Sequence, residues 1–165
     1  SYLAKSPSAQ KSLEALIAWD TAHAADAMPL FGQELFEQAQ KKGPLTETAY
    51  RKARDDARRL AGAQGLIATL DKDNLDALIA PSMAPAWPTD PVLGDHFLGA
   101  GYGIAAVAGT PSITVPMGDV RGLPIGLAFL GRSYSEPELL GFAYAYEQAT
   151  HMRKPPQYLP TLVTP

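Results

Sequence analysis

Four residues that could take part in chemistry lie in one proline-rich stretch of this 165-residue chain. The stretch runs from Pro81 to Phe97 as PSMAPAWPTDPVLGDHF, and it contains Trp87 and the pair Asp95 and His96. A carboxylate and an imidazole can exchange protons, and aromatic rings can hold an apolar ligand. The prolines and the lack of periodicity predict a long ordered loop, and such loops are commonly functional. A role in loop structure is the favoured interpretation of the acidic and imidazole pair, and direct chemistry is the alternative.

Other catalytic arrangements find little support among the residues. A Ser–His–Asp hydrolase of the nucleophile-elbow type needs G-x-S-x-G, which is absent. His23 and His151 lie on or near the ends of expected helices, where surface placement is the default. The chain has no cysteine, so it has no disulfide framework and no thiolate nucleophile or metal site. We therefore predict no metal site on this chain.

Two stretches resemble ligand-binding motifs only in part. GYGIAA (Gly101–Ala106) matches G-x-G-x-x-A, and Asp119 lies 18 residues after Gly101, but no strand precedes it and the following helix is short. DKDNLD (Asp71–Asp76) begins like a calcium loop, but it has Leu75 where a ligand is needed. We interpret the first as tight helix packing and the second as a helix-to-strand turn, and we expect no cofactor.

The charge of the chain disfavours nucleic acid and membranes as partners. The net charge is −3, and the basic side chains between Arg51 and Arg59 alternate with Asp55 and Asp56. That spacing is typical of a solvated helix face with i,i+4 pairs. No window reaches the roughly 18 apolar residues of a membrane span. The hydrophobic fraction of 46% and charged fraction of 19% are those of a soluble globular protein, and the cytoplasm is the favoured compartment.

The first half of the chain has the periodicity of helices. Ser12 is a plausible N-cap of a helix whose apolar stripe runs on to Ala24. A second helix is expected over Gln33–Lys42, where Gly and Pro follow. Thr46 is expected to cap a third helix that runs into Ile67, with two glycines weakening its middle.

The second half predicts strands as well as helices. Apolar runs bounded by turn residues predict strands over Leu75–Pro81, Ser112–Pro116 and Ile125–Gly131. A helix of small residues is expected over Gly99–Gly109, and the capping box Ser135–Glu138 opens a last helix.

The order of these elements predicts an α/β fold with a small mixed sheet flanked by helices. A helical crossover joins the first two strands, so they should run in the same direction. The connection to the third strand is too short for a crossover, so that strand should return antiparallel. Pro111 and Pro116 are expected to mark the ends of the middle strand, because proline is tolerated only at strand ends, edges and bulges.

Three stretches together resemble one family. LDALIAPSMAPAW, GYGIAAVAGTPSITVPMG and GLPIGLAFLGRSYSEPELLGFAYAYEQAT resemble the C-terminal end of amidase-signature hydrolases. The upstream stretches MPLFGQELFEQA and RLAGAQG resemble the peptide-amidase branch. The resemblance covers essentially the whole chain, so residues 1–165 are interpreted as one C-terminal segment of an amidase-signature domain whose sheet is larger.

The resemblance implies acyl transfer from a C–N amide bond to a serine nucleophile, with a second serine in a cis peptide and a lysine relaying protons. The Gly- and Ser-rich region that carries these residues in the family has no counterpart here, and Lys41, Lys42 and Lys52 are ordinary helix lysines. No catalytic residue is therefore placed on this chain. The chain starts with SYLAKSPSAQK, without an initiator Met or a signal pattern, and we expect it to be cut from a longer one.

The resemblance also implies a role for the proline-rich loop. Trp87, Asp95, His96 and Phe97 would line the channel for a small amide or the C-terminal amide of a peptide, bound together with the missing N-terminal part. An amidotransferase A-subunit-like protein and a noncatalytic interaction module are the alternatives. We expect the chain alone to be inactive and to self-associate through an exposed sheet edge.

Overall fold

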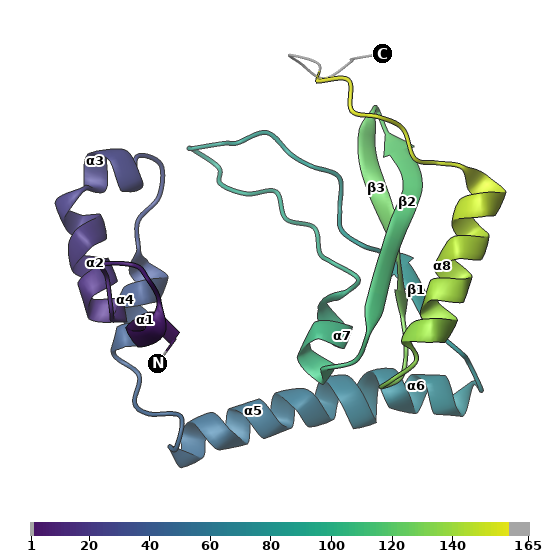
Figure 1. The fold of residues 1–165 in the computed structure, drawn as a ribbon, viewed down its shortest axis with the longest axis horizontal. Coiled ribbons are helices and arrows are strands. Elements are labelled where there is room, and N and C mark those ends of the chain that lie inside the picture. Colours follow the sequence, from purple (N-terminus) through teal and green to yellow (C-terminus); the bar gives the residue numbers. More distant parts are fainter. Residues whose placement is uncertain (1, 159–165) are drawn as a thin grey trace. The chain divides into compact units, whose positions relative to one another are not determined.

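The computed structural model describes residues 2–158, in two compact units that divide between Thr48 and Ala49 (Figure 1). The first unit holds four short helices, and the second holds a three-stranded sheet with helices. The bounds in the first unit are α1 (Tyr2–Lys5), α2 (Leu13–Ala22), α3 (Ala24–Ala27) and α4 (Glu34–Gln40). Those that follow are α5 (Thr48–Ala61), the π-helical turn η1 (Gly62–Leu66), α6 (Ile67–Lys72), β1 (Leu78–Pro81), α7 (Gly103–Ala108), β2 (Ser112–Val120), β3 (Leu123–Leu130) and α8 (Glu136–Thr150).

The first unit is held by hydrogen bonds between α2 and the start of α4. Ser12 caps α2 as predicted, and its hydroxyl accepts the backbone N–H of Ala15 at 3.1 Å. The side-chain amide of Gln33 donates to the Ile17 carbonyl at 3.1 Å and to the Thr21 hydroxyl at 2.9 Å. These bonds join the two helices. No residue between 2 and 48 is fully buried.

The long helix of the second unit changes its geometry where the glycines lie. It begins at Thr48 rather than directly after Thr46, because the N–H of Glu47 closes a turn on the Pro44 carbonyl. Gly62 and Gly65 were expected to weaken its middle, and the π-helical turn η1 occupies that place.

The sheet has the strand order β1-β3-β2, and both neighbouring pairs are antiparallel. β1 and β2 therefore run in the same direction, as predicted, but β3 lies between them and neither pairs with the other. Ala128 of β3 is opposite Ala80 on one side and Thr114 on the other. The α/β class predicted from the sequence is confirmed, but the three described strands form an antiparallel sheet rather than a mixed one.

The strand bounds differ from the expectations for local reasons. β1 begins at Leu78 rather than Leu75, because the N–H of Leu75 donates to the Leu70 carbonyl at 2.8 Å and closes the preceding helix. Pro116 does not end β2: the strand continues to Val120, with a bulge between Pro116 and Gly118. An edge strand at a bulge tolerates a proline, since no ladder hydrogen bond is lost there.

The turn between β2 and β3 is shorter than the sequence suggested. Its two central residues, Arg121 and Gly122, have φ angles of 54° and 82°. Positive φ at both central positions is typical of the tight hairpin turns that match strand twist. β3 therefore already begins at Leu123 rather than Ile125, and it ends at Leu130, before Gly131.

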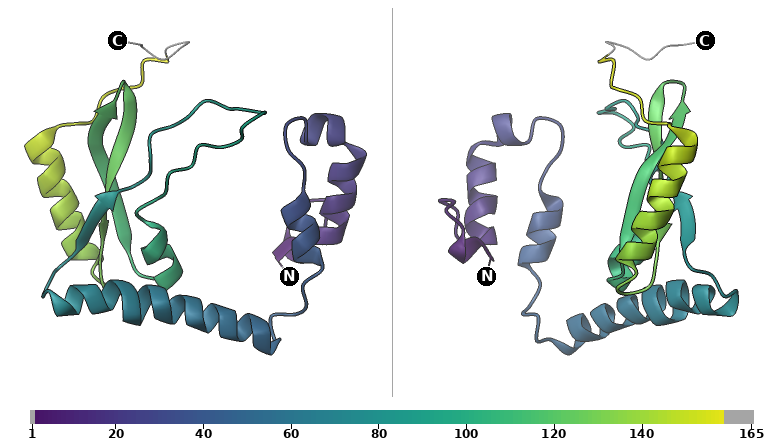
Figure 2. Two further views of the ribbon diagram at one scale, coloured as in Figure 1. Left: turned by 180° about the vertical axis from the view of Figure 1, so that it is seen from behind. Right: turned by 45° about the vertical axis from the view of Figure 1, so that its right-hand side comes forward.

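Helices pack on both faces of the sheet (Figure 2). α8 lies along the strands, and its Leu139 and Ala143 contact Leu127 and Phe129 of β3. Ser135 is the N-cap of α8, but its hydroxyl donates to the Arg132 carbonyl at 2.8 Å instead of accepting a helix amide, so the predicted capping box is wrong.

The opposite face of the sheet packs against η1, α6 and α7. The buried residues of this cluster are Leu66, Leu70, Ala105, Ala128 and Leu130. Alternate residues of β3 thus belong to different clusters, as the two-residue period of a strand requires. This second unit holds the base of the proline-rich loop.

Candidate functional site

The segment between β1 and α7, here called the β1–α7 loop (residues 82–102), contains all four predicted site residues. Its two ends are fixed by the backbone. The N–H of Ser82 donates to the Gly126 carbonyl of β3 at 2.7 Å. The N–H of Gly101 donates to the carbonyls of Pro81 and Ser82 at 3.2 Å and 3.1 Å. The loop therefore leaves the sheet and returns to it at the same place.

Close packing at the base of the loop explains one glycine of the GYGIAA stretch. A Cβ on Gly101 would lie 2.4 Å from the Pro81 carbonyl oxygen and 2.6 Å from the Ala80 Cβ. The interpretation of this stretch as tight packing therefore holds at Gly101 but not at Gly103, where an added Cβ would meet nothing within 4 Å.

Two hydroxyl groups lie beside this base, one on the first residue after β1 and the other on β2. The Ser82 Oγ and the Thr114 Oγ1 are hydrogen-bonded to each other. A Cβ on Gly126 would lie 2.6 Å from the Thr114 Oγ1, so the absence of a side chain on β3 makes room for the pair. The two hydroxyls satisfy each other, and among the described residues no base is hydrogen-bonded to them that would activate a nucleophile.

Three of the four predicted residues come together within the loop. The indole N–H of Trp87 donates to the Asp95 Oδ1 at 3.1 Å. The rings of Trp87 and Phe97 meet edge to face, with centroids 6.2 Å apart and planes at 70°. Trp87 is half-buried, whereas Asp95 and Phe97 are exposed. This arrangement gives an aromatic surface with a carboxylate at one end.

His96 points to a different carboxylate from its neighbour in sequence. Its Nε2 lies 4.0 Å from the Asp90 Oδ2. The other oxygen of Asp90 accepts the backbone N–H groups of Leu93 at 2.8 Å and Val92 at 2.9 Å, and these bonds lower the pKa of Asp90. Asp95 and His96 therefore do not form a proton-exchanging pair.

Asp90 is the residue of this loop that the sequence reasoning missed. Its carbonyl also accepts the Gly94 N–H at 2.9 Å, so it organises the turn from both its side chain and its backbone. An aspartate followed by proline and, four residues on, by glycine is a recognisable turn signal, and it could have been found.

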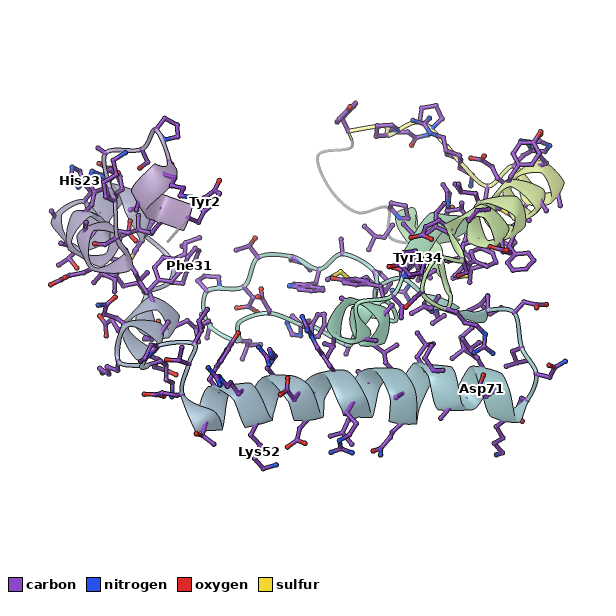
Figure 3. All side chains as sticks on the ribbon, turned by 60° about the horizontal axis from the view of Figure 1, so that its bottom comes forward. Tyr2, His23, Phe31, Lys52, Asp71 and Tyr134 are labelled. Carbon is purple, nitrogen blue, oxygen red and sulfur yellow. The ribbon has the colours of Figure 1, made fainter. Side chains whose placement is uncertain are left out.

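The charged helix α5 pairs its own charges, as its sequence indicated. Lys52 points outward from α5 in Figure 3 and forms an ion pair with Asp56, which also binds Arg59 at 3.0 Å. The two basic groups lower the pKa of Asp56, Lys52 having the larger effect. The charges named here are thus paired within the exposed face of the same helix.

An open cavity of about 810 Å³ lies away from the loop, between the β2–β3 turn and residues 152–158. Asp119 and Lys154 form an ion pair of 3.0 Å at its wall. The Lys154 ammonium, and secondly the Gly122 N–H, lower the pKa of Asp119. The described residues that line this cavity supply no nucleophile and base together, so the aromatic loop is the better candidate for ligand contact.

Metal sites and membrane-spanning helices were also considered within the part of the chain that the structure describes. Among residues 2–158, no group of three or more His, Cys, Asp or Glu side chains could hold a metal ion. In the same range, no helix combines the length and the apolar character needed to cross a bilayer. The loop can bind through aromatic and apolar contacts, but it carries no bond-making constellation.

Comparison with known proteins gives a family match. The family model described as Amidase matches residues 8–140. An Arabidopsis thaliana protein described as a probable amidase is 32% identical over 162 residues, which are 95% of this chain and 27% of that protein. The chain thus spans little more than a quarter of that relative's length.

Solved structures and shorter matches refine the comparison. The native peptide amidase from Stenotrophomonas maltophilia is 48% identical, with a TM-score of 0.86 over 95% of this chain and 31% of its own. The A subunit of a glutamyl-tRNA(Gln) amidotransferase from Methanosarcina barkeri is 47% identical over 53 residues, covering 31% of this chain and 11% of its own length.

Proposed function

Since the chain belongs to the amidase family, we propose that it is the C-terminal part of an amidase that hydrolyses carbon–nitrogen amide bonds. The observation that carries this proposal is the similarity to a solved peptide amidase along nearly the whole chain. That similarity favours the C-terminal amide of a peptide as the substrate.

In this proposal the bond-making residues lie outside the 165 residues. The hydroxyls of Ser82 and Thr114 bind each other rather than a base, and His96 faces Asp90 instead of a hydroxyl. A serine nucleophile supported by a second serine and a lysine would be supplied by the rest of the enzyme. The chain alone is then inactive.

The role proposed for this chain is to hold substrate. Trp87, Asp95, His96 and Phe97 line the substrate channel, on a loop whose base is fixed to the sheet. Functional loops on a rigid scaffold are a common way to combine variable recognition with a constant frame. The aromatic surface suits an uncharged amide better than a polyanion.

The experiment compares the 165-residue chain with the full-length enzyme. Release of ammonia from an N-acylated peptide amide, and of ammonia or amine from an aryl amide, is measured. We expect turnover by the full-length enzyme and none above background by the chain. Turnover by the purified chain would show that its own residues suffice, and no turnover by the full-length enzyme would remove the amidase proposal.

Variants of the full-length enzyme test the loop. Trp87→Ala and His96→Ala are expected to raise the KM for a peptide amide several-fold, about 3- to 30-fold, with intact folding. Val92→Ala is the matched control, because this side chain is 87% exposed in the same loop. Wild-type kinetics in both Trp87→Ala and His96→Ala would show that the loop does not line the channel.

An amidotransferase A-subunit-like protein is the second candidate, favoured by the high identity of the shorter matches. Those matches cover about a third of the chain, whereas the peptide amidase covers nearly all of it. Ammonia release from free glutamine, with no release from peptide amides, would favour this candidate.

A further inference from the structure

The four candidate residues of the β1–α7 loop are organised around two different carboxylates. Asp90 holds a turn through two backbone N–H groups and lies 4.0 Å from His96. Asp95 makes no such backbone contact and instead accepts the indole N–H of Trp87. Asp90 therefore holds the backbone turn and Asp95 holds the indole, although the two residues are only five positions apart.

The bond from Trp87 restricts the indole at its polar end. A tryptophan side chain has one N–H donor, and satisfying it selects one of the ring orientations that the rotamers permit. The ring of Phe97 meets the indole edge to face, so a second contact acts on the apolar part of the same ring. Together the two contacts fix the orientation of a half-buried ring on a loop whose residues 91–98 are exposed.

The chemistry of the surroundings indicates what such a ring would contact. Between residues 82 and 102 there are two aspartates and no lysine or arginine. The loop also exposes Leu93 and Leu98, at 75% and 84%. An acidic group would be repelled here and a large uncharged group would gain apolar contact, because the hydrophobic gain follows the area removed from water.

We propose that Asp95 is a positioning residue that orients Trp87, and that Trp87 and Phe97 select amide substrates carrying a large apolar side chain. This proposal rests on the amidase function proposed above. Asp95 lies in the wall of the proposed channel, but it acts on substrate selection through the indole rather than by binding the substrate. Its carboxylate matters as a hydrogen-bond acceptor rather than as a charge.

The test uses the full-length enzyme with N-acetylphenylalanine amide and N-acetylglycine amide. In Asp95→Leu, which lacks an acceptor, the KM for the phenylalanine amide should rise about tenfold, with kcat and the glycine amide kinetics nearly unchanged. Asp95→Asn keeps an oxygen acceptor and should behave like the wild type. Val92→Ala serves as the control on the same loop.

A spectroscopic measurement follows the ring directly. The chain has two tryptophans, so Trp19→Phe leaves Trp87 as its only tryptophan, and excitation at the red edge of indole absorption avoids the seven tyrosines. In that background, Asp95→Leu should increase acrylamide quenching and lower the anisotropy of Trp87, whereas Asp95→Asn should do neither. This readout separates ring positioning from a general loss of folding, which circular dichroism would detect.

The outcomes separate the two proposals. If the full-length enzyme hydrolyses neither amide, the amidase function and this inference both fall. If it hydrolyses both and Asp95→Leu keeps the wild-type ratio of phenylalanine to glycine amide, only the positioning role is overturned. Equal effects of Asp95→Asn and Asp95→Leu would overturn it as well, because charge would then be the acting property.

Discussion

The first unit buries none of its side chains between residues 2 and 48, whereas the second buries apolar side chains on both faces of its sheet. Leu35 of α4 is 77% exposed, but Leu66 and Leu70 are fully buried. All three are leucines on helices, so residue type alone does not decide burial. The difference is the presence of a sheet, which offers each packed helix a broad apolar face.

This contrast indicates where the free energy of unfolding originates. Stabilisation by apolar side chains follows the surface that they remove from water. The first unit is instead held by local capping and by the hydrogen bonds of Gln33. Net contributions of single hydrogen bonds are only about 0.5–1.5 kcal/mol. The second unit should therefore dominate the measured stability of the chain.

Truncating a leucine in each unit gives the largest expected difference. Leu70→Ala removes a fully buried side chain and should lower the free energy of unfolding by about 2–5 kcal/mol. Leu35→Ala should change it by less than about 0.5 kcal/mol. Urea unfolding measures the free energy of unfolding of both variants. Equal losses of unfolding free energy would contradict the contrast between the two units, because Leu35 would then be buried in solution.

A pair of glycines sharpens the comparison inside the second unit. Gly101→Ala places a Cβ 2.4 Å from the Pro81 oxygen, and we expect a loss of about 1–3 kcal/mol. Gly103→Ala is the control, because its Cβ would meet nothing within 4 Å. That substitution should be neutral or stabilise α7 by up to about 1 kcal/mol. Similar results for both would show that the loop base relaxes.

Self-association distinguishes the two units in another way. We propose that the isolated chain pairs through the free edge of β1, where Ile79 is 64% exposed. A charge there should weaken association about tenfold in Ile79→Lys. Phe31→Lys, on the 74% exposed apolar surface of the first unit, should leave it unchanged. Sedimentation at several concentrations measures the association of each variant. Weaker association in Phe31→Lys but not in Ile79→Lys would assign the contact to the first unit.

The smallest expected effect concerns the ion pair between Asp119 of β2 and Lys154. Asp119 has a pKa lowered by Lys154 and by the Gly122 N–H. A lowered folded-state pKa means that the contribution to stability is present above the unfolded-state pKa and is lost as pH falls through the folded-state value. In an NMR titration, Lys154→Met should raise the pKa of Asp119 and leave it still below the ordinary range. An unchanged pKa would show that the turn amide alone holds the carboxylate.

The architecture was predictable where local signals agreed. Ser12, the glycines Gly62 and Gly65, and the apolar runs indicated α2, the irregular middle of the long helix and the three strands. Pro116 misled, because a proline marks a strand end or a bulge equally well, and only pairing with β3 distinguishes the two. The strand order also depends on long-range pairing, which periodicity does not specify.

The role of the four loop residues in binding stays a prediction, and the contacts between them could not be predicted from the sequence. Trp87, Asp95 and Phe97 meet because the loop turns at Asp90, and the geometry of that turn decides which neighbour each side chain faces. Adjacency in sequence suggested that Asp95 and His96 act together. Consecutive residues in an irregular loop project in different directions, so His96 faces Asp90 instead.

The closed base of the β1–α7 loop bears on how such a chain can diversify. Because the N–H of Gly101 donates to the carbonyls of Pro81 and Ser82, the residues between them enter and leave the scaffold at a single point. Insertions, deletions or replacement of this whole segment would leave the strand register untouched, since loop length adds little to the cost of closing an existing loop. Under the proposed channel role, selection alters substrate range by exchanging one contiguous piece of gene, and a loop grafted from a relative should carry that relative's specificity without redesign of the sheet.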